Sequence, residues 1–354
     1  MNLFRSSVWL LLAASLYNCT AADRTAATVL PTQRPIPQVA TAPPGVDRYD
    51  ARLDRLISPT AKLERLAAGF NWSEGPVWIG PATTGFLLFS DIPENKVYRW
   101  SAADGLTTYL EPAGYTGAYF AGKEPGSNRL LTDPEGRLLL CQHGDRRIAR
   151  MSAPLDAPLP VYETVTAFYD GSRLNSPNDA VFHKNGDLYF TDPPYGLPGL
   201  AESCVKELAF QGVFRYSFAE DSLTLLTDEL SRPNGIAFTP DYSHLIVANS
   251  DRKRAVWTKY PVRTDGTLGA GEVFNDVTDR IPGPHGGAPD GMAMHTSGNL
   301  FATGPGGIYI FSPNGEELGL IRTGQKTGNC TFNADQSMLY ITADSLLYRL
   351  PLLD

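Results

Sequence analysis

The chain has 354 residues, including 33 Gly, 28 Pro, 16 Tyr and 16 Phe, a length that suits one large domain or two ordinary ones. Its formal net charge of −8 argues against a general nucleic-acid-binding protein, because such proteins carry a basic stripe. The four Cys residues are too few for a disulfide framework and lack metal-binding spacing. Cys141 and Cys330 lie in or beside predicted strands, where buried thiols are expected.

The first 21 residues have the pattern of a secretory signal peptide. Arg5 supplies a positive charge, an apolar run follows over residues 8–16, and cleavage after Ala21 would leave small residues at the positions that the peptidase reads. The apolar run is too short to cross a bilayer as a helix. We therefore expect an exported protein, periplasmic or extracellular, without a membrane span. Lipid attachment at Cys19 is the alternative, although Tyr17 and Asn18 match such a site poorly.

Residues 22–60 are predicted to form a leader. As far as about Asp50 the sequence is rich in Ala, Thr and Pro and poor in large apolar residues, which is typical of a tether. Between Tyr49 and Leu63 apolar residues recur at roughly helical spacing, so we expect a short helix there. Residues 61–354 are predicted to form the main domain.

The main domain is built from a repeat that is clearest at residues 176–192. A short apolar run ends at Phe182, a turn follows at Lys184–Gly186, and a second run begins at Leu188. Asn-Gly between such runs is a strong β-hairpin signal, because Gly tolerates positive φ. The pattern occurs six times, at intervals of 38 to 56 residues. The positions equivalent to Phe182 are Trp78, Thr132, Phe238, Met294 and Phe332.

Six repeats of this kind predict an all-β fold, a six-bladed β-propeller. Short strands and glycine turns at this spacing are typical of propeller blades rather than of helical arrays. The predicted second strands are Phe86–Asp91, Leu138–Cys141, Leu188–Asp192, Leu245–Asn249, Leu300–Thr303 and Leu339–Thr342. A ring of blades must close, and we predict that the final run Leu346–Leu350 pairs with a strand from near the N-terminus of the domain.

Polar residues recur four positions before each aligned residue. They are Glu74, Asn128, Asn178, Asn234, Asp290 and Gly328. The innermost strands of a propeller line its central channel, so equivalent positions at their starts should form a ring at one mouth. Five of these six residues carry a side-chain oxygen, whereas strand packing selects β-branched and aromatic residues.

This ring predicts a metal site. Buried carboxylates that face each other are costly unless a cation balances them. Oxygen ligands without His or Cys favour Ca²⁺, with Mg²⁺, Mn²⁺ or Zn²⁺ as alternatives. Each residue also has a local explanation: Asn178 and Asn234 could stabilise turns, and Glu74 and Asp290 could simply begin strands. The shared phase favours the metal site.

Four motifs resemble the gluconolactonase, regucalcin and senescence-marker-protein family of calcium-dependent lactonases, over about Leu66–Leu350. They are Ser73–Trp78 (SEGPVW), Ser176–Asp179 (SPND), Arg232–Ala237 (RPNGIA) and Ala288–Met292 (APDGM). The resemblance implies a six-bladed propeller with one divalent metal at the channel mouth. It also implies that the metal ligands are Glu74, Asn178, Asn234 and Asp290, with Asp290 as the acid/base group. Regucalcin-type members have Arg where this chain has Ser176, so their grip on a sugar acid is not expected here.

The predicted activity is hydrolysis of a sugar-type lactone such as gluconolactone. The metal would polarise the carbonyl group, and Asp290 would take a proton from water and return it to the ring oxygen. Asn128 and Asn178 are the candidates for substrate contacts. No Gly-x-Ser-x-Gly motif is present, which disfavours an acyl-enzyme route. His143 and His285 are each open between a role at the site and a structural one.

Two alternatives remain at this point. One is hydrolysis of other lactones or of organophosphate esters at the same metal, since the more distant paraoxonases share the metal arrangement. The other is a non-catalytic propeller that binds a carbohydrate or a protein and uses calcium only as a structural ion.

Overall fold

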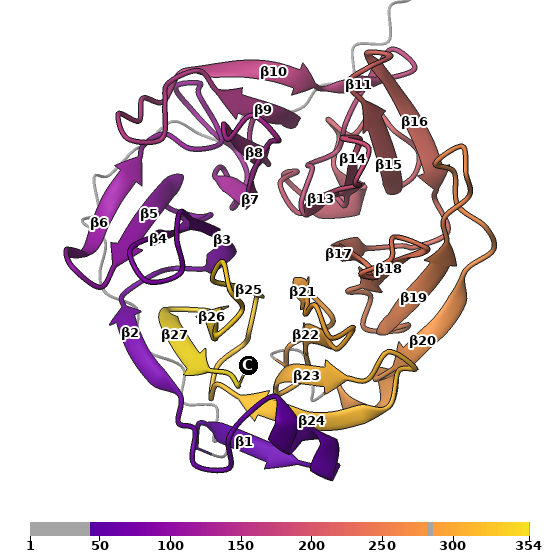
Figure 1. Ribbon diagram of the computed structural model, residues 1–354. Coiled ribbons are helices and arrows are strands. Elements are labelled where there is room, and N and C mark those ends of the chain that lie inside the picture. Colours follow the sequence, from indigo (N-terminus) through magenta and orange to yellow (C-terminus); the bar gives the residue numbers. More distant parts are fainter. Residues whose placement is uncertain (1–42, 282–285, 354) are drawn as a thin grey trace, which may run out of the picture. The chain divides into compact units, whose positions relative to one another are not determined.

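The structure is a computed structural model that describes residues 43–281 and 286–353, all of them within the compact unit Val39–Asp354. Six antiparallel sheets stand around a common centre, as the six-bladed prediction requires (Figure 1). The predicted signal peptide, Cys19, most of the leader and His285 lie outside the described residues. Within the described ranges no helix is long and apolar enough to cross a membrane.

The first three blades each have four strands, named here from the centre outward. The first blade is β3 (Ser73–Ile79), β4 (Phe86–Asp91), β5 (Lys96–Ser101) and β6 (Gly105–Leu110). The second is β7 (Ser127–Thr132), β8 (Leu138–Gln142), β9 (Arg147–Met151) and β10 (Tyr162–Thr166). The third is β13 (Ala180–Phe182), β14 (Leu188–Asp192), β15 (Gly212–Ser217) and β16 (Ser222–Thr227). A small hairpin, β11 (Phe168–Tyr169) and β12 (Ser172–Arg173), precedes the third blade.

The last three blades follow the same plan, and two of them recruit a strand from the N-terminal side. The fourth blade is β17 (Pro233–Phe238), β18 (His244–Asn249), β19 (Val256–Pro261) and β20 (Glu272–Asp276). The fifth is β21 (Met292–Met294), β22 (Leu300–Gly304), β23 (Gly307–Phe311) and β24 (Glu317–Arg322), with β1 (Gly45–Arg48) added outside. The sixth is β25 (Asn329–Phe332), β26 (Met338–Ala343) and β27 (Leu346–Pro351), completed by β2 (Glu64–Ala68).

The pairing of β2 with β27 closes the ring. Their antiparallel register sets Glu64 opposite Arg349, whose Nε lies 2.8 Å from a Glu64 carboxylate oxygen. The inner strands contact one another in the order β3, β7, β13, β17, β21, β25 and back to β3. The predicted pairing of the final strand with one from the N-terminal side is confirmed. The pairing of β2 with β27 thus joins the two ends of the domain by backbone hydrogen bonds within the sixth sheet.

The segment before β2, residues 45–57, packs against the fifth blade and is called the N-terminal clasp. Strand β1 lies within the predicted leader and pairs with β24, and Asp47 receives two hydrogen bonds from the Arg322 guanidinium, at 2.8 and 2.9 Å. Where the sequence predicted a short helix, the structure has the 3₁₀ turn η1 (Ala51–Arg55), which begins after Asp50 accepts a hydrogen bond from the Arg52 N–H. Two further 3₁₀ turns are η2 (Leu200–Glu202) and η3 (Thr278–Arg280).

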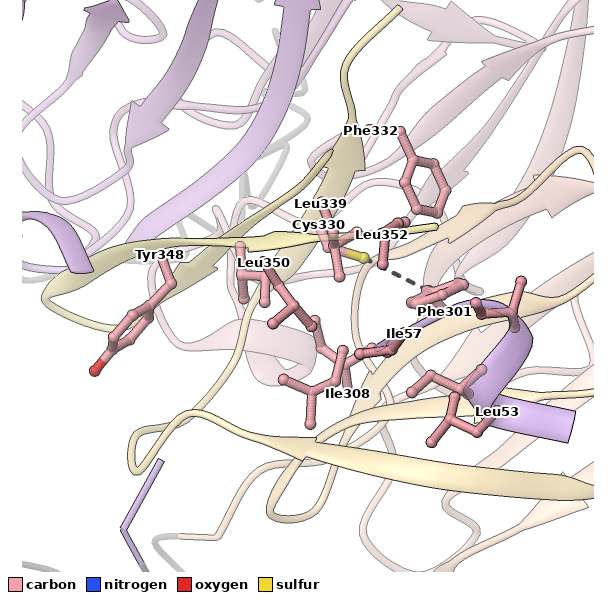
Figure 2. Close-up of a cluster of buried hydrophobic side chains, with 14 of the residues drawn as sticks. Leu53, Ile57, Phe301, Ile308, Cys330, Phe332, Leu339, Tyr348, Leu350 and Leu352 are labelled. Carbon is pink, nitrogen blue, oxygen red and sulfur yellow. Dashed lines mark hydrogen bonds between the residues drawn. The ribbon is translucent and has the colours of Figure 1, made fainter. Parts of the chain in front are cut away.

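The hydrophobic core lies between neighbouring sheets, because alternate residues of each strand point to opposite faces. Figure 2 shows the cluster between the fifth and sixth blades, where Leu53 of η1 and Ile57 pack with Phe301 and Cys330. All four side chains are fully buried. Cys141 is buried in the same way, and it and Cys330 are free thiols, as predicted.

Candidate functional site

The predicted ring residues meet in one pocket. A cavity of about 210 Å³ is lined by all five of the oxygen-bearing ring residues, Glu74, Asn128, Asn178, Asn234 and Asp290. They come from the starts of five different inner strands. Glu74, Asn128, Asn178 and Asn234 are almost completely buried, and Asp290 is partly exposed.

Local irregularities in the inner strands aim these side chains. The pairing register shifts in β3 between Glu74 and Val77, in β7 between Ser127 and Leu130, and in β17 between Pro233 and Ile236. A bulge of this kind bends a strand and redirects its side chains, and bulges are common beside active sites. Asn178 and Asp290 instead lie two residues before β13 and β21, where their backbone N–H groups still donate to the second strands, to the Thr191 carbonyl at 2.9 Å and the Thr303 carbonyl at 3.2 Å.

Hydroxyl groups on the second strands hold the inner strands in place. The Ser90 hydroxyl donates to the Asn128 carbonyl at 2.8 Å, and the Thr191 hydroxyl donates to the Asn234 carbonyl at the same distance. The Thr303 hydroxyl donates to the Gly328 carbonyl at 3.0 Å. Each hydroxyl thus fixes the backbone of a ring position in the next blade. Sequence reasoning missed these residues, although Ser-Asp and Thr-Asp at the ends of second runs were a visible signal.

Two of those hydroxyl residues, Ser90 and Thr191, are followed by an Asp that anchors the loop leading into the inner strand. Asp91 accepts hydrogen bonds from the N–H groups of Asn71 and Trp72, at 3.0 and 3.1 Å. Asp192 accepts equivalent bonds from Asn175 and Ser176, both at 2.7 Å. Asn175 and Ser176 precede Asn178, and Trp72 precedes Glu74, so these bonds set the height of the pocket residues along the channel.

Three carboxyl groups line the pocket, those of Glu74, Glu124 and Asp290, and burial disfavours the charged forms of the two ring members, Glu74 and Asp290. Burial raises the pKa of Glu74, although a hydrogen bond from the Gly75 N–H, 2.9 Å from Oε2, opposes the shift. Burial is also the main reason that the pKa of Asp290 is raised, and the charge of Glu74 raises it further. A nearby cation would stabilise the ionised form of both carboxyl groups and so lower their pKa values.

Two of the three pocket amides, those of Asn178 and Asn234, have their nitrogen next to a hydrogen-bonding side chain. Asn178 Nδ2 lies 3.4 Å from His143 Nε2, and His143 Nδ1 lies 3.0 Å from a Glu124 carboxylate oxygen. Asn234 Nδ2 donates to the Ser250 hydroxyl at 2.9 Å. The oxygen of an amide lies opposite its nitrogen, so both carbonyl oxygens point away from these partners.

His143 lies behind the pocket rather than in its wall. Its side chain has no exposed surface, and its contact with the site passes through Asn178. Sequence analysis left its role open, and the structure places it beside the ring. His285 lies outside the described residues, so its role stays a prediction.

Other residues complete the pocket wall. Sequence reasoning did not identify the basic side chains Arg232, Arg252 and Lys326, nor Trp72 and Tyr195. Arg232 directly precedes the Pro-Asn-Gly motif and Lys326 lies two residues before Gly328, so both were within reach of the repeat phase. Among residues 43–281 and 286–353, no group of three or more His, Cys, Asp or Glu side chains is arranged to hold a metal ion. Glu124 also lines the pocket, but its carboxylate lies 3.0 Å from His143 Nδ1, so the candidate donors are the carboxylates of Glu74 and Asp290 and the amide oxygens.

Known proteins resemble this chain in sequence and in fold. The SMP-30/Gluconolactonase/LRE-like region matches residues 72–345. A gluconolactonase of Zymomonas mobilis is 39% identical over 310 residues, which cover 86% of this chain and 85% of that protein. A solved gluconolactonase from Xanthomonas campestris has a TM-score of 0.74 and 31% identity, covering 88% of this chain and 95% of that one. Regucalcin from Agrobacterium tumefaciens shares the fold at 18% identity, with a TM-score of 0.59 over 80% of this chain and 90% of that one.

Proposed function

The chain belongs to the SMP-30/gluconolactonase/LRE-like family, and from this premise we propose that it hydrolyses sugar-type lactones with the help of a divalent cation. The observation that carries the proposal is the convergence of five oxygen-bearing ring residues on one pocket. Relatives named gluconolactonase that match most of both chains support the lactone as substrate class.

The donor set fits a hard cation. Glu74, Asn178, Asn234 and Asp290 would hold it, and every donor is an oxygen. Ca²⁺ suits such a set best, Mg²⁺ and Mn²⁺ follow, and Zn²⁺ more often takes nitrogen or sulfur ligands. The raised pKa values of Glu74 and Asp290 are consistent with a site that ionises when a cation is present. When bound, the cation would draw electron density from the lactone carbonyl group.

Asp290 is the proposed acid/base group. It is the partly exposed carboxyl of the pair, so water and substrate can reach it, whereas Glu74 is enclosed. Its carboxylate would take a proton from the water whose oxygen attacks the carbonyl carbon. As the bond between that carbon and the ring oxygen breaks, Asp290 would return the proton to the ring oxygen. The product is an open-chain hydroxy acid.

The pocket wall suits a small, hydroxyl-rich molecule. Asn128 shares the ring phase without belonging to the proposed ligand set, so its amide is available for a substrate hydroxyl. Asn178 is proposed to contact substrate as well as metal. Arg232 and Lys326 add positive charge to the wall. That charge would attract the carboxylate of the product and the electronegative oxygens of the substrate.

Acid release from glucono-δ-lactone, measured in a pH-stat after subtraction of the spontaneous rate, tests the proposal. A simple aliphatic lactone and an organophosphate ester run beside it distinguish the substrate classes. We expect turnover of the sugar lactone and loss of at least 100-fold in kcat for Asp290→Asn, since general acid–base catalysis contributes about 10²–10⁴-fold. Faster turnover of either comparison substrate would redirect the proposal, and no turnover of any would favour a binding protein.

We also propose that the protein is exported, with residues 1–21 removed. The support is the charged start and the short apolar run described above. Mass spectrometry of the protein recovered outside the cytoplasm tests it. A mature chain that begins at Ala22 is expected, and a retained Met1 would contradict it.

A further inference from the structure

The two candidate amide ligands raise a question of orientation. Only the oxygen of an Asn side chain can bind a cation, yet its oxygen and nitrogen are nearly the same size. Packing alone therefore cannot decide which atom faces the pocket. The hydrogen-bond partner of each amide decides its orientation, because a partner that can only accept a hydrogen bond selects the nitrogen.

For Asn178 the partner is a histidine whose proton position is fixed by a carboxylate. An ionised Glu124 can only accept, so His143 Nδ1, 3.0 Å away, must carry the hydrogen. In the tautomer that carries its hydrogen on Nδ1, the lone pair of Nε2 faces Asn178 Nδ2, 3.4 Å away. In the reversed orientation the Asn178 oxygen would face that lone pair, which is repulsive.

The imidazole has little freedom to move away from this position. It is fully buried, and a Cβ atom at Gly196 would lie 2.6 Å from the His143 Cβ. The backbone N–H of His143 donates to the Gly126 carbonyl at 3.1 Å. His143 therefore offers Asn178 a stationary acceptor.

For Asn234 a hydroxyl group does the same work. The Ser250 hydroxyl donates its hydrogen to the Pro289 carbonyl, so its lone pairs are what remain for Asn234. Asn234 Nδ2 donates to that oxygen at 2.9 Å. Pro289 directly precedes Asp290. The Ser250 hydroxyl therefore links the Asn234 side chain to the backbone next to Asp290. Ser250 is largely buried, which protects these bonds from exchange with water.

We propose that Glu124, His143 and Ser250 are positioning residues that turn the carbonyl oxygens of Asn178 and Asn234 toward the cation. Two unrelated chains of hydrogen bonds, carboxylate to imidazole to amide and carbonyl to hydroxyl to amide, produce one result. This inference rests on the proposed metal-dependent function. Removing residues that orient metal ligands costs about 10–100-fold in metal affinity.

Isothermal titration of Ca²⁺ into chelator-treated protein tests the inference without any activity assay. His143→Leu, Glu124→Ala and Ser250→Ala are each expected to weaken Ca²⁺ binding by about 10–100-fold. Ser250→Thr keeps the hydroxyl and should retain wild-type affinity. Cys141→Ala is the matched control, because it truncates a fully buried side chain near His143 without touching either amide. Its melting temperature should fall while its Ca²⁺ affinity stays unchanged.

A second readout separates positioning from direct participation. At saturating Ca²⁺ the kcat of His143→Leu should return to within a few-fold of the wild-type value, which loss of a reacting group would not allow. Glu124 and Ser250 line the pocket themselves, so their variants are compared by Ca²⁺ affinity alone. Folded His143→Leu and Ser250→Ala proteins with wild-type Ca²⁺ affinity would overturn the positioning role alone. A wild-type protein that binds none of Ca²⁺, Mg²⁺ and Mn²⁺ would overturn the proposed metal function and this inference together.

Discussion

Gly328 occupies the sixth ring position, and the Glu74 carboxylate fills the space where a side chain at residue 328 would lie. A Cβ atom at Gly328 would lie 2.5 Å from Glu74 Oε1. Gly75, next to Glu74, has φ of +53° and would place a Cβ atom 2.0 Å from the Asn128 carbonyl oxygen. Both positions therefore require glycine, the first for the acid and the second for the approach of two inner strands.

Gly328→Ala should displace the Glu74 carboxylate and weaken Ca²⁺ binding at least about tenfold, as loss of support for a ligand does. Gly45→Ala is the matched control, since its nearest neighbour, 3.3 Å away, is the movable end of the Arg322 side chain. Calorimetric titration of both variants makes the comparison. Equal affinities in the two would contradict the role given to Glu74.

Protonation of the two pocket acids should couple stability to pH. Burial raises the pKa of Glu74 from 4.5 to about 8 and raises the pKa of Asp290 too. The folded metal-free protein therefore binds protons more tightly than the unfolded chain. This contribution to stability is complete below pH 4.5 and is lost as the pH rises through about 8. A cation binds the ionised acids, so its stabilising effect must grow over the same interval.

The measurement is the increase in Tm on adding Ca²⁺, which we expect to be larger at pH 8 than at pH 5. Glu74→Gln removes one of the two titrating groups and should reduce this difference. An increase in Tm that is the same at both pH values would contradict the ionisation of the pair.

The N-terminal clasp, residues 45–57, joins both the sheet and the core of the fifth blade. Strand β1 extends the fifth sheet, and η1 inserts Leu53 between the fifth and sixth blades (Figure 2). Leu53 is fully buried there. Four residues of strand and one 3₁₀ turn thereby cover an apolar surface to which Tyr348 and Leu350 of β27 also contribute.

Leu53→Ala should lower the free energy of unfolding by about 2–5 kcal/mol, the cost of emptying a buried leucine site. Leu159→Ala, at a largely exposed leucine, should change it by less than about 0.5 kcal/mol. Urea denaturation followed by tryptophan fluorescence measures both. Similar losses in the two variants would show that the clasp is not part of the core.

The elements differ in how far sequence could foretell them. The second strands were predictable because each combines an apolar run with a turn signal, and β4 and β14 have the predicted bounds. Strand β1 was not, since the residues Gly-Val-Asp-Arg show no apolar alternation and its pairing comes from the free edge of β24. The Thr303 hydroxyl acts across blades and is followed by Gly304, so its contact lacks the Ser-Asp or Thr-Asp signal that marks Ser90 and Thr191.

Across the whole domain, closure of the ring brings residues at equivalent positions of the repeat into one pocket. Glu74 and Asp290 are far apart in the chain, yet contacts between successive inner strands bring both to one pocket. The repeat phase predicted five residues of that pocket. The phase gave only ring positions, so it did not single out Ser250. The direction of the amides could not be predicted either, because hydrogen bonds to His143 of the second blade and to Ser250 set it.

The most direct measurement is the rate of glucono-δ-lactone hydrolysis by one protein sample before chelation, after chelation and after Ca²⁺ is restored. We expect activity to be lost when the cation is removed and regained when it is restored, and we expect Asp290→Asn to stay inactive throughout although it folds. Full activity in the chelated protein, or in Asp290→Asn, would contradict the proposal that the ring of oxygens and its acid carry out the reaction.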